Sequence, residues 1–485
     1  MGIAPDGAHV AYVSDATGEY QIHVAPQDGR GEVETFPIDG SGFYDRLQWS
    51  PDSEKISFTD NAWASYILDV ESGEVTKIDQ EPIYGPVRTT HHAWSPDSRW
   101  LAYTKLTPTY FQRVHLYSLE DGTSTPVTDG LADVSEPVFD ASGKYLWFFS
   151  STDAGPVRTW FAQSNADVRP TRSLYLAVLP DGEENPLAKE SDEEEVETDG
   201  EDENGEDEDN GNGENGNGEE KEENGEENGD EPEAPEVTVD FADLSQHILA
   251  LPVEPGNYVS LQAGEAGHVY FLEIPAQIAG RGGFNGPPPM KLHHFDLDKR
   301  EGEVLGEAVT GYALSRNHKK MLVGGPGGSY SIVDVGKIEP GKGKIATEAM
   351  RAKIDPRAEW NQMFVEAWRI NRDFFYDPGM HGADWPAMRE KYEAFLPHLA
   401  TRDDLNRVIR WMLSEISVGH SYLAGGEPLM ELETVPGGLL GADYEVDGDR
   451  YRFAKVYGGL NWNPELRSPL TEPGVDVREG EYLLA

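Results

Sequence analysis

A polar turn followed by an alternating apolar strand recurs along the first third of the chain. The turns read APDG from Ala4, WSPDS from Trp49 and WSPDS from Trp94, and each precedes a strand-like run, HVAYVSD, KISFTD or WLAYTK. A decayed fourth copy, FDASG from Phe139, precedes YLWFFS. Proline fixes φ in a tight turn, and Asp-Gly or Asp-Ser completes it. Every copy therefore predicts a turn and then a strand.

The spacing of these turns is typical of a β-propeller. The residues at the proline position, Pro5, Pro51, Pro96 and Ala141, are 46, 45 and 45 residues apart. A repeat of this length matches one four-stranded blade, and a second hairpin follows each turn. Two weaker units recur at 261–272 and 314–323, giving about six turn motifs.

We therefore predict propeller blades over residues 1–187 and 237–345. The first turn motif lacks the strands that should precede it, so the propeller is expected to be incomplete on its N-terminal side. A closed ring is then expected to need sequence upstream of Met1.

Between the fourth and fifth units lies a strongly acidic segment with almost no apolar residue. From Glu190 to Glu236 it contains 25 Asp and Glu residues against a single lysine, Lys221. Such a composition cannot bury a core and repels itself. We expect residues 188–236 to be a disordered insertion in a surface hairpin.

From Asp355 the apolar period changes from two to about 3.6, which predicts helices. Pro356 opens the first helix, whose stripe contains Trp360, Phe364, Ala367, Trp368 and Phe375. Asp384 is placed to cap a second helix, and Thr401 with Asp404 forms a capping box for a third that runs to Ile416. The third helix has a predicted buried face made of Leu405, Val408, Ile409, Met412 and Ile416. These helices define a module at 350–432.

Two further stretches read as β structure. Residues 417–423, SVGHSYL, are short and partly alternating, so we expect a strand leaving the third helix. After Pro436 the pattern predicts two strands around an Asp447-Gly448 turn, a hairpin signal. Residues 437–485 form the last predicted domain, and the pattern breaks off within a strand.

Composition removes several classes of function. The 485 residues contain no cysteine, which excludes disulfides, thiolate metal sites and a cysteine nucleophile. The formal net charge of −50 argues against nucleic acid or an anionic membrane as a partner. There is also no apolar run long enough to cross a bilayer, and no metal or organic cofactor is inferred.

His420 is the first candidate for chemistry. It lies between Gly419 and Ser421 where a helix gives way to a strand, so it can be held in place while open to a cleft. The same stretch, Gly419-His420-Ser421-Tyr422-Leu423, is one residue short of the Gly-x-Ser-x-Gly nucleophile elbow. A hydrolase that uses Ser421 would have to react with a fluorophosphonate probe. Only 64 residues follow Ser421, and they show no parallel sheet and no late Asp and His.

Two histidine pairs are weaker candidates. His91-His92 and His293-His294 alternate across their predicted strands and lack a carboxylate at ligand spacing. We therefore expect no metal at either pair.

The order of these segments resembles the tricorn protease family of serine peptidases. Ser-Pro-Asp turns come first, then EAWRINRDFFYDPGMHGADWPAMREKYEAFLPHLATRDDLNRVIRWMLSEISVGHSYL, then GLLGADY and EGEYLLA. The resemblance implies a multidomain, mainly β chain. A β-propeller would be followed by a helical first core domain and then by an incomplete, PDZ-like β domain at 437–485.

The resemblance also implies roles for residues. His420 matches the family's general base, with Gly419 and Ser421 beside it as candidate supporting residues. The best-known family form has a serine where this chain has Gly419. The nucleophilic serine, the oxyanion hole and the late glutamate have no counterpart before Ala485. This chain alone is therefore not expected to hydrolyse peptides.

The family further implies peptide substrates that reach the site through the propeller as a channel or filter. It implies a cytoplasmic location and a homo-oligomer. The alternative is a propeller and PDZ-like protein that binds peptides without cleaving them.

Overall fold

The computed structural model describes residues 1–38, 42–82, 90–152, 171–188, 234–275, 288–339, 341–426, 437–460, 462–463 and 466–484. The chain divides into two compact units. One comprises Met1–Ile354 with Ile370–Tyr376, and the other comprises Asp355–Arg369 with Asp377–Ala485. Each unit is described by itself.

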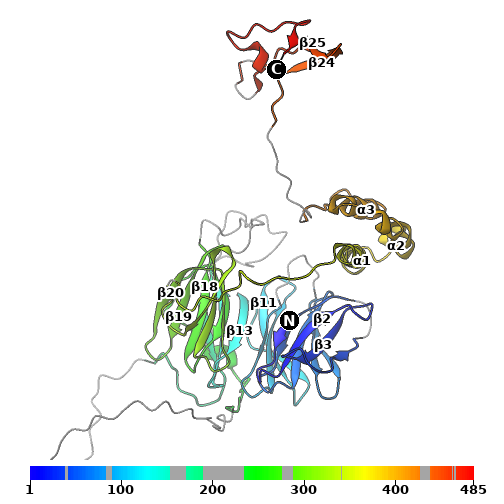
Figure 1. Ribbon diagram of the computed structural model, residues 1–485. Coiled ribbons are helices and arrows are strands. Elements are labelled where there is room, and N and C mark those ends of the chain that lie inside the picture. The colour runs from blue at the N-terminus through cyan, green and yellow to red at the C-terminus, as the bar shows by residue number, and fades with distance from the viewer. Residues whose placement is uncertain are drawn as a thin grey trace, which may run out of the picture. The chain divides into compact units, whose positions relative to one another are not determined.

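The described part of the first unit forms six antiparallel sheets, each made of strands consecutive in sequence (Figure 1). Five sheets have four strands and the sixth has three. This confirms the predicted blades. The strands, sheet by sheet, are β1 Gly2–Ile3, β2 His9–Ser14, β3 Gln21–Pro26 and β4 Glu34–Phe36; β5 Tyr44–Trp49, β6 Lys55–Asp60, β7 Ala64–Asp69 and β8 Val75–Gln80; β9 His92–Trp94, β10 Trp100–Leu106, β11 Gln112–Ser118 and β12 Thr123–Pro126; β13 Asp133–Phe139, β14 Tyr145–Ser151, β15 Ser173–Val178 and β16 Ile248–Ala250; β17 Tyr258–Ala263, β18 His268–Glu273, β19 Met290–Asp296 and β20 Glu301–Val309; β21 Gly311–Leu314, β22 Lys320–Gly325 and β23 Ser329–Asp334.

One detail of the sequence prediction is wrong. A strand does precede the first turn motif, because β1 pairs with β2 through Gly2 opposite Ala11 and Ile3 opposite Val10. The sequence pattern could not predict this strand, because its two residues are too few to show alternation.

The repeated WSPDS turn works both within a sheet and between sheets. Within the third sheet, Ser95 Oγ donates to Asp97 at 2.5 Å and accepts from the Trp100 N–H at 2.9 Å. Between sheets, Trp94 Nε1 donates to the Gln48 carbonyl of the second sheet at 3.1 Å. Ser98 Oγ accepts from the Asp52 N–H at 3.1 Å.

The copy at Trp49 makes the same links to the first sheet. Trp49 Nε1 donates to the Gly2 carbonyl at 3.1 Å, and Ser53 Oγ accepts from the Asp6 N–H at 3.0 Å. The tryptophan and the last serine of the motif thus join the second sheet to the first and the third sheet to the second.

The core of the first unit lies between successive sheets. Strand alternation sends one side chain to each neighbouring sheet: on β18, Phe271 packs toward the fourth sheet and Leu272 toward the sixth. The sixth sheet turns Met321 and Val323 toward the fifth. Its other face leaves apolar side chains 39–51% exposed, namely Leu322, Tyr330 and Ile332.

A cavity of about 590 Å³ lies where the six sheets converge. Its wall includes residues from the inner strands or turns of every sheet, among them Pro5, Gln48, Trp94, Phe139, Leu261 and Ser315. Arg316 of the sixth sheet donates to the Pro5 carbonyl of the first at 3.1 Å. The sheets therefore surround a common centre, as a propeller does.

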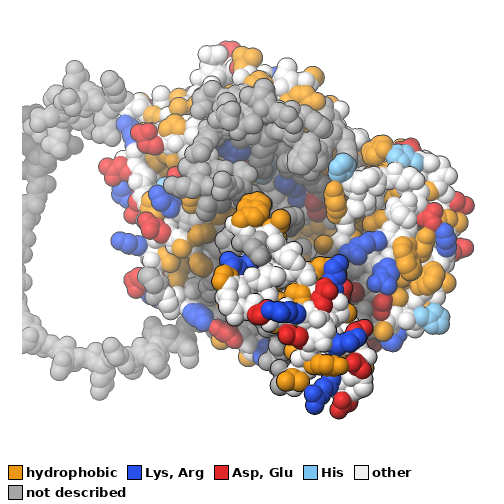
Figure 2. Space-filling model, turned by 90° about the horizontal axis from the view of Figure 1, so that it is seen from above, with side chains coloured by type: hydrophobic (Ala, Val, Ile, Leu, Met, Phe, Trp, Pro, Cys, Tyr) orange, Lys and Arg blue, Asp and Glu red, His pale blue; other side chains and the backbone are white. Residues whose placement is uncertain are grey.

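The acidic insertion falls in the connection between β15 and β16, and residues 189–233 lie outside the described part of the chain. Both of its described ends are anchored. The Ala188 carbonyl accepts from Arg300 at 2.8 Å, and the Val237 N–H donates to Asp97 at 2.7 Å. On the face drawn in Figure 2, basic and acidic side chains are interspersed.

The helical module follows the predicted pattern. Trp360, Phe364 and Trp368 of the first helix are buried, and the Asp384 cap and the Thr401–Asp404 capping box are both present. The last helix ends at Ser414, two residues before the predicted end, but all five residues of its predicted face are buried. In the described residues the α-helices are α1 Pro356–Phe374, α2 Trp385–Glu393 and α3 Arg402–Ser414, and the short 3-10 helices are η2 Leu244–His247, η3 Pro326–Gly328, η4 Met380–Gly382, η5 Leu396–His398 and η7 Pro469–Thr471.

The last described strands form one small antiparallel sheet. Its strands are β24 Ala442–Asp447, β25 Arg450–Val456 and β26 Tyr482–Leu483. Asp447 pairs with Arg450 across Gly448, whose φ is +69°, so the predicted hairpin is confirmed. None of the helices in the described residues is long and apolar enough to span a membrane.

Candidate functional site

His420 lies in the segment that follows α3. Ser417 has a left-handed φ of +58°, which ends the helical path, and the chain then runs without strand pairing through 421–426. The predicted strand at 417–423 is therefore wrong. In place of strand pairing, the Leu423 carbonyl of this segment accepts from Arg410, with Nη2 at 2.8 Å and Nε at 3.2 Å.

The imidazole of His420 is exposed. Its ring meets the edge of the Tyr422 ring, with centroids 6.2 Å apart, and Tyr422 is itself 83% exposed. No described residue hydrogen-bonds to either nitrogen of His420. A histidine that acts as a general base needs a partner on one nitrogen to fix its tautomer and a substrate or nucleophile at the other. The described residues supply neither.

The two neighbours of His420 leave room for such partners. A Cβ placed on Gly419 would meet no heavy atom within 4 Å, so a serine would fit there. Ser421 is exposed and makes no side-chain hydrogen bond within the described part of the chain. Nothing in this geometry activates Ser421 as a nucleophile.

A second histidine borders this segment and was missed in the sequence. His381 Nδ1 lies 2.9 Å from the Ile416 carbonyl, to which it donates. The His381 N–H donates to Asp377 at 2.8 Å, and His381 has a φ of +54°. The Asp377-Pro378-Gly379 turn predicts the end of α1, but it does not predict the direction of the His381 side chain.

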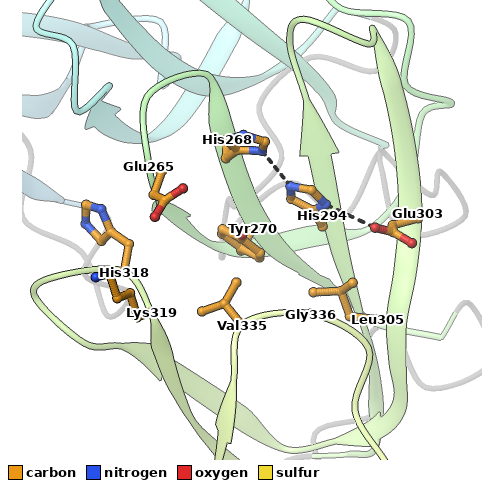
Figure 3. Close-up of a pocket in the computed structure, with 10 residues that line it drawn as sticks. All are labelled: Glu265, His268, Tyr270, His294, Glu303, Leu305, His318, Lys319, Val335 and Gly336. Atoms are coloured by element: carbon orange, nitrogen blue, oxygen red, sulfur yellow. Dashed lines mark hydrogen bonds and ion pairs between the residues drawn. The ribbon is translucent and has the colours of Figure 1, made fainter. Parts of the chain in front are cut away.

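A separate histidine cluster lines a cavity of about 350 Å³ between the fifth and sixth sheets (Figure 3). His268 Nδ1 is 2.9 Å from His294 Nε2, and His294 Nδ1 is 3.4 Å from Glu303. His318 and Lys319 face this row from the β21–β22 turn. Burial lowers the pKa of His294, and Glu303 opposes that effect.

The carboxylates that the sequence appeared to lack come from neighbouring strands. Glu303 stands opposite His294, and Glu273 is 3.0 Å from His293. Spacing along one strand could not show these cross-strand pairs.

The distance between His268 and His294 nevertheless fits a hydrogen bond better than a shared metal ion. A zinc ion with bonds of about 2.0–2.1 Å would hold two imidazole nitrogens about 3.3 Å apart, farther than the direct contact between His268 and His294. Among the described residues, no group of three or more His, Asp or Glu side chains could hold a metal ion.

His92 of the other predicted pair is partly buried in the propeller. Its Nε2 is 2.9 Å from Ser65 Oγ. Burial, with a contribution from Arg46, lowers its pKa to about 3. His92 is thus neutral at ordinary pH.

Three family models match consecutive parts of the chain. The model of the tricorn protease second beta propeller domain matches residues 1–336. The tricorn protease C1 domain matches 356–414, and the tricorn protease PDZ domain matches 438–485. His420 lies between the second and third matches.

Individual proteins show the same likeness. The chain is 27% identical to tricorn protease homolog 1 of Streptomyces coelicolor, over 98% of this chain and 43% of that protein. It is 24% identical to the tricorn protease of Thermoplasma acidophilum, over 84% and 35%. A crystal structure of the tricorn protease matches with a TM-score of 0.67 and 20% identity, over 97% of this chain and 42% of that one. The chain spans less than half the length of each of these proteins.

Proposed function

The chain belongs to the tricorn protease family, and from this premise we propose that it supplies the general base and the propeller of a serine-type peptidase that degrades oligopeptides. The observation that carries the proposal is His420, an exposed imidazole in a segment attached to a helical module of the family. In this role the imidazole takes the proton of a serine hydroxyl as that serine attacks a peptide carbonyl. It then returns the proton to the leaving amine.

The serine itself is proposed to come from polypeptide outside these 485 residues. The open surroundings of His420 support this, because a nucleophile and an orienting group both have to approach its ring. The small sheet at the end of the chain also leaves apolar side chains exposed, among them Val446 at 71% and Tyr451 at 56%. A sheet of three strands needs a packed face for stability, so further polypeptide is expected to cover it.

Gly419 and Ser421 are proposed as supporting residues only. Gly419 offers space beside the base rather than a hydroxyl, so the orienting group of this protein must come from elsewhere. The propeller would act as a channel or filter for peptides around its central cavity. A cytoplasmic homo-oligomer is the expected setting.

Cleavage of oligopeptides tests the proposal. The assay uses the extended protein, meaning this chain continued through the polypeptide that supplies the serine. His420→Ala should lower the cleavage rate by about 10³-fold or more. His398→Ala is the matched control, since His398 is also an exposed histidine of the helical module, and it should keep the rate.

Full activity in His420→Ala would contradict the assigned base. If the extended protein binds peptides but never cleaves them, the non-catalytic, peptide-binding alternative holds instead.

A further inference from the structure

Helix α3 presents two different faces. One is apolar and buried, with Leu405, Val408 and Met412 at 0–3% exposure. The other carries Arg402, Asn406 and Arg410, which are four residues apart and so lie in one row along the helix. The apolar face packs α3 into its module, which leaves the polar row free for another task.

The row binds the segment that follows His420. Arg402 Nε donates to Asn406 Oδ1 at 3.2 Å, and Asn406 Nδ2 donates to the Gly425 carbonyl at 2.9 Å. Arg410 binds the Leu423 carbonyl one turn farther along the helix. The carbonyls of Leu423 and Gly425 are thus both bound by side chains of the row.

Asn406 makes this attachment specific. Its side chain is 3% exposed, and a buried amide is costly unless its groups are hydrogen-bonded. Arg402 satisfies its oxygen, while its nitrogen finds the Gly425 carbonyl. Moving the segment away from α3 would leave a buried donor without its acceptor, so the position of Gly425 is tied to the helix.

On the other side of His420, the His381 side chain binds the Ile416 carbonyl. His420 is thus bracketed by an anchor at Ile416 and by anchors at Leu423 and Gly425. Within the described residues these contacts take the place of the strand pairing that the sequence predicted.

We propose that the row Arg402, Asn406 and Arg410 positions His420 for catalysis. The inference rests on the proposed function, because it assumes that His420 is the base. These residues are positioning residues that act through the backbone and touch no reacting atom. A displacement of about 1 Å at a catalytic group can cost about 10²-fold in rate, so even partial loosening of the segment should be measurable.

Arg410→Ala is the informative variant, because Arg410 is exposed and its loss should leave α3 folded. The matched control is Arg407→Ala, an exposed arginine on the same helix and outside the row. In this chain, hydrogen exchange of the peptide covering 417–426 should be at least about threefold faster in Arg410→Ala than in Arg407→Ala. Exchange within α3 should be the same in both variants.

In the extended protein, Arg410→Ala should lower kcat by about tenfold with KM nearly unchanged, and Arg410→Lys should restore part of the loss. Arg407→Ala should stay within about twofold of the unsubstituted protein. The inference is overturned if Arg410→Ala keeps kcat, whether or not exchange rises. That failure is separate from failure of the proposed function, which would show as activity remaining in His420→Ala.

Discussion

The turns of the propeller and the segment around His420 are both short connections, yet they are stabilised in opposite ways. A propeller turn is fixed by its own residues and by its neighbour, as when Ser95 binds Asp97 while Trp94 reaches the Gln48 carbonyl. The His420 segment is bound through its carbonyls to α3, and its imidazole points to solvent without a hydrogen bond from the described residues. The described propeller turns are thus held by contacts with neighbouring sheets, whereas the described residues leave the imidazole of His420 without a hydrogen-bond partner.

The largest difference in stability is expected when a large side chain is removed from each of the two regions. Phe58 is fully buried between the first two sheets, so Phe58→Ala should lower the free energy of unfolding by about 3–5 kcal/mol. Tyr422→Ala removes an exposed ring and should change it by less than about 0.5 kcal/mol. Denaturant unfolding followed by circular dichroism measures both. Equal losses would mean that the two regions are packed alike.

Propeller stability should also depend on pH, because the propeller contains titratable groups whose pKa values are shifted in the fold. The pKa of His92 is about 3 in the fold against about 6.5 in an unfolded chain. The unfolded chain therefore binds more protons between pH 6.5 and 3, and stability falls as the pH falls through that window, by up to about 1.4 kcal/mol per unit. His92→Gln should flatten this acid loss in unfolding curves.

Glu81 provides a control of opposite sign. Burial raises its pKa to about 7, although the Leu106 N–H and Thr90 hydroxyl oppose the shift. The fold then binds more protons than the unfolded chain between pH 4.5 and 7, so stability falls as the pH rises. Glu81→Gln should gain stability relative to the unsubstituted chain across that range. If His92→Gln and Glu81→Gln changed the slope of unfolding free energy against pH in the same direction, the opposite pKa shifts of the two groups would be contradicted.

A smaller effect is expected from a single inter-sheet link. Trp94→Phe keeps an aromatic ring but removes the donor to the Gln48 carbonyl, which should cost about 1–2 kcal/mol. Tyr117→Phe serves as the control, since it lies in the same apolar cluster and no such inter-sheet link is described for it. Thermal unfolding of both variants would show whether the repeated tryptophan joins sheets or only fills space.

The smallest effect is expected at the candidate site. Gly419→Ser introduces the hydroxyl found in the best-known family form, and its Cβ meets no heavy atom within 4 Å. The free energy of unfolding should change by less than about 0.5 kcal/mol. A larger loss, measured by denaturant unfolding, would show that the position is more restricted than the geometry indicates.

Much of the fold could be predicted because the repeat encodes local structure. The WSPDS turns and the strands after them, the Asp384 cap and the buried face of α3 all follow from residues within a few positions of each other. The cross-sheet roles of Trp94 and Ser98 could not be seen, since their partners lie 46 residues away.

The candidate site was predicted less completely. His420 could be singled out by its setting, but the segment around it was read as a strand. The alternation of 417–423 was real, yet strand pairing depends on a partner that the sequence pattern cannot show. Asn406 and Arg410, which hold the segment instead, read as ordinary polar positions on a helix. The cross-strand partners of His293 and His294 were hidden for the same reason.

The central claim, that His420 activates a serine supplied from outside this chain, is tested most directly by fluorophosphonate labelling of the extended protein. Labelled residues are located by mass spectrometry, and the labelling rate is compared between His420→Ala and His398→Ala. The account predicts one labelled serine beyond Ala485, with the rate lowered at least about 100-fold in His420→Ala and unchanged in His398→Ala. Labelling of Ser421, or an undiminished rate in His420→Ala, would contradict it.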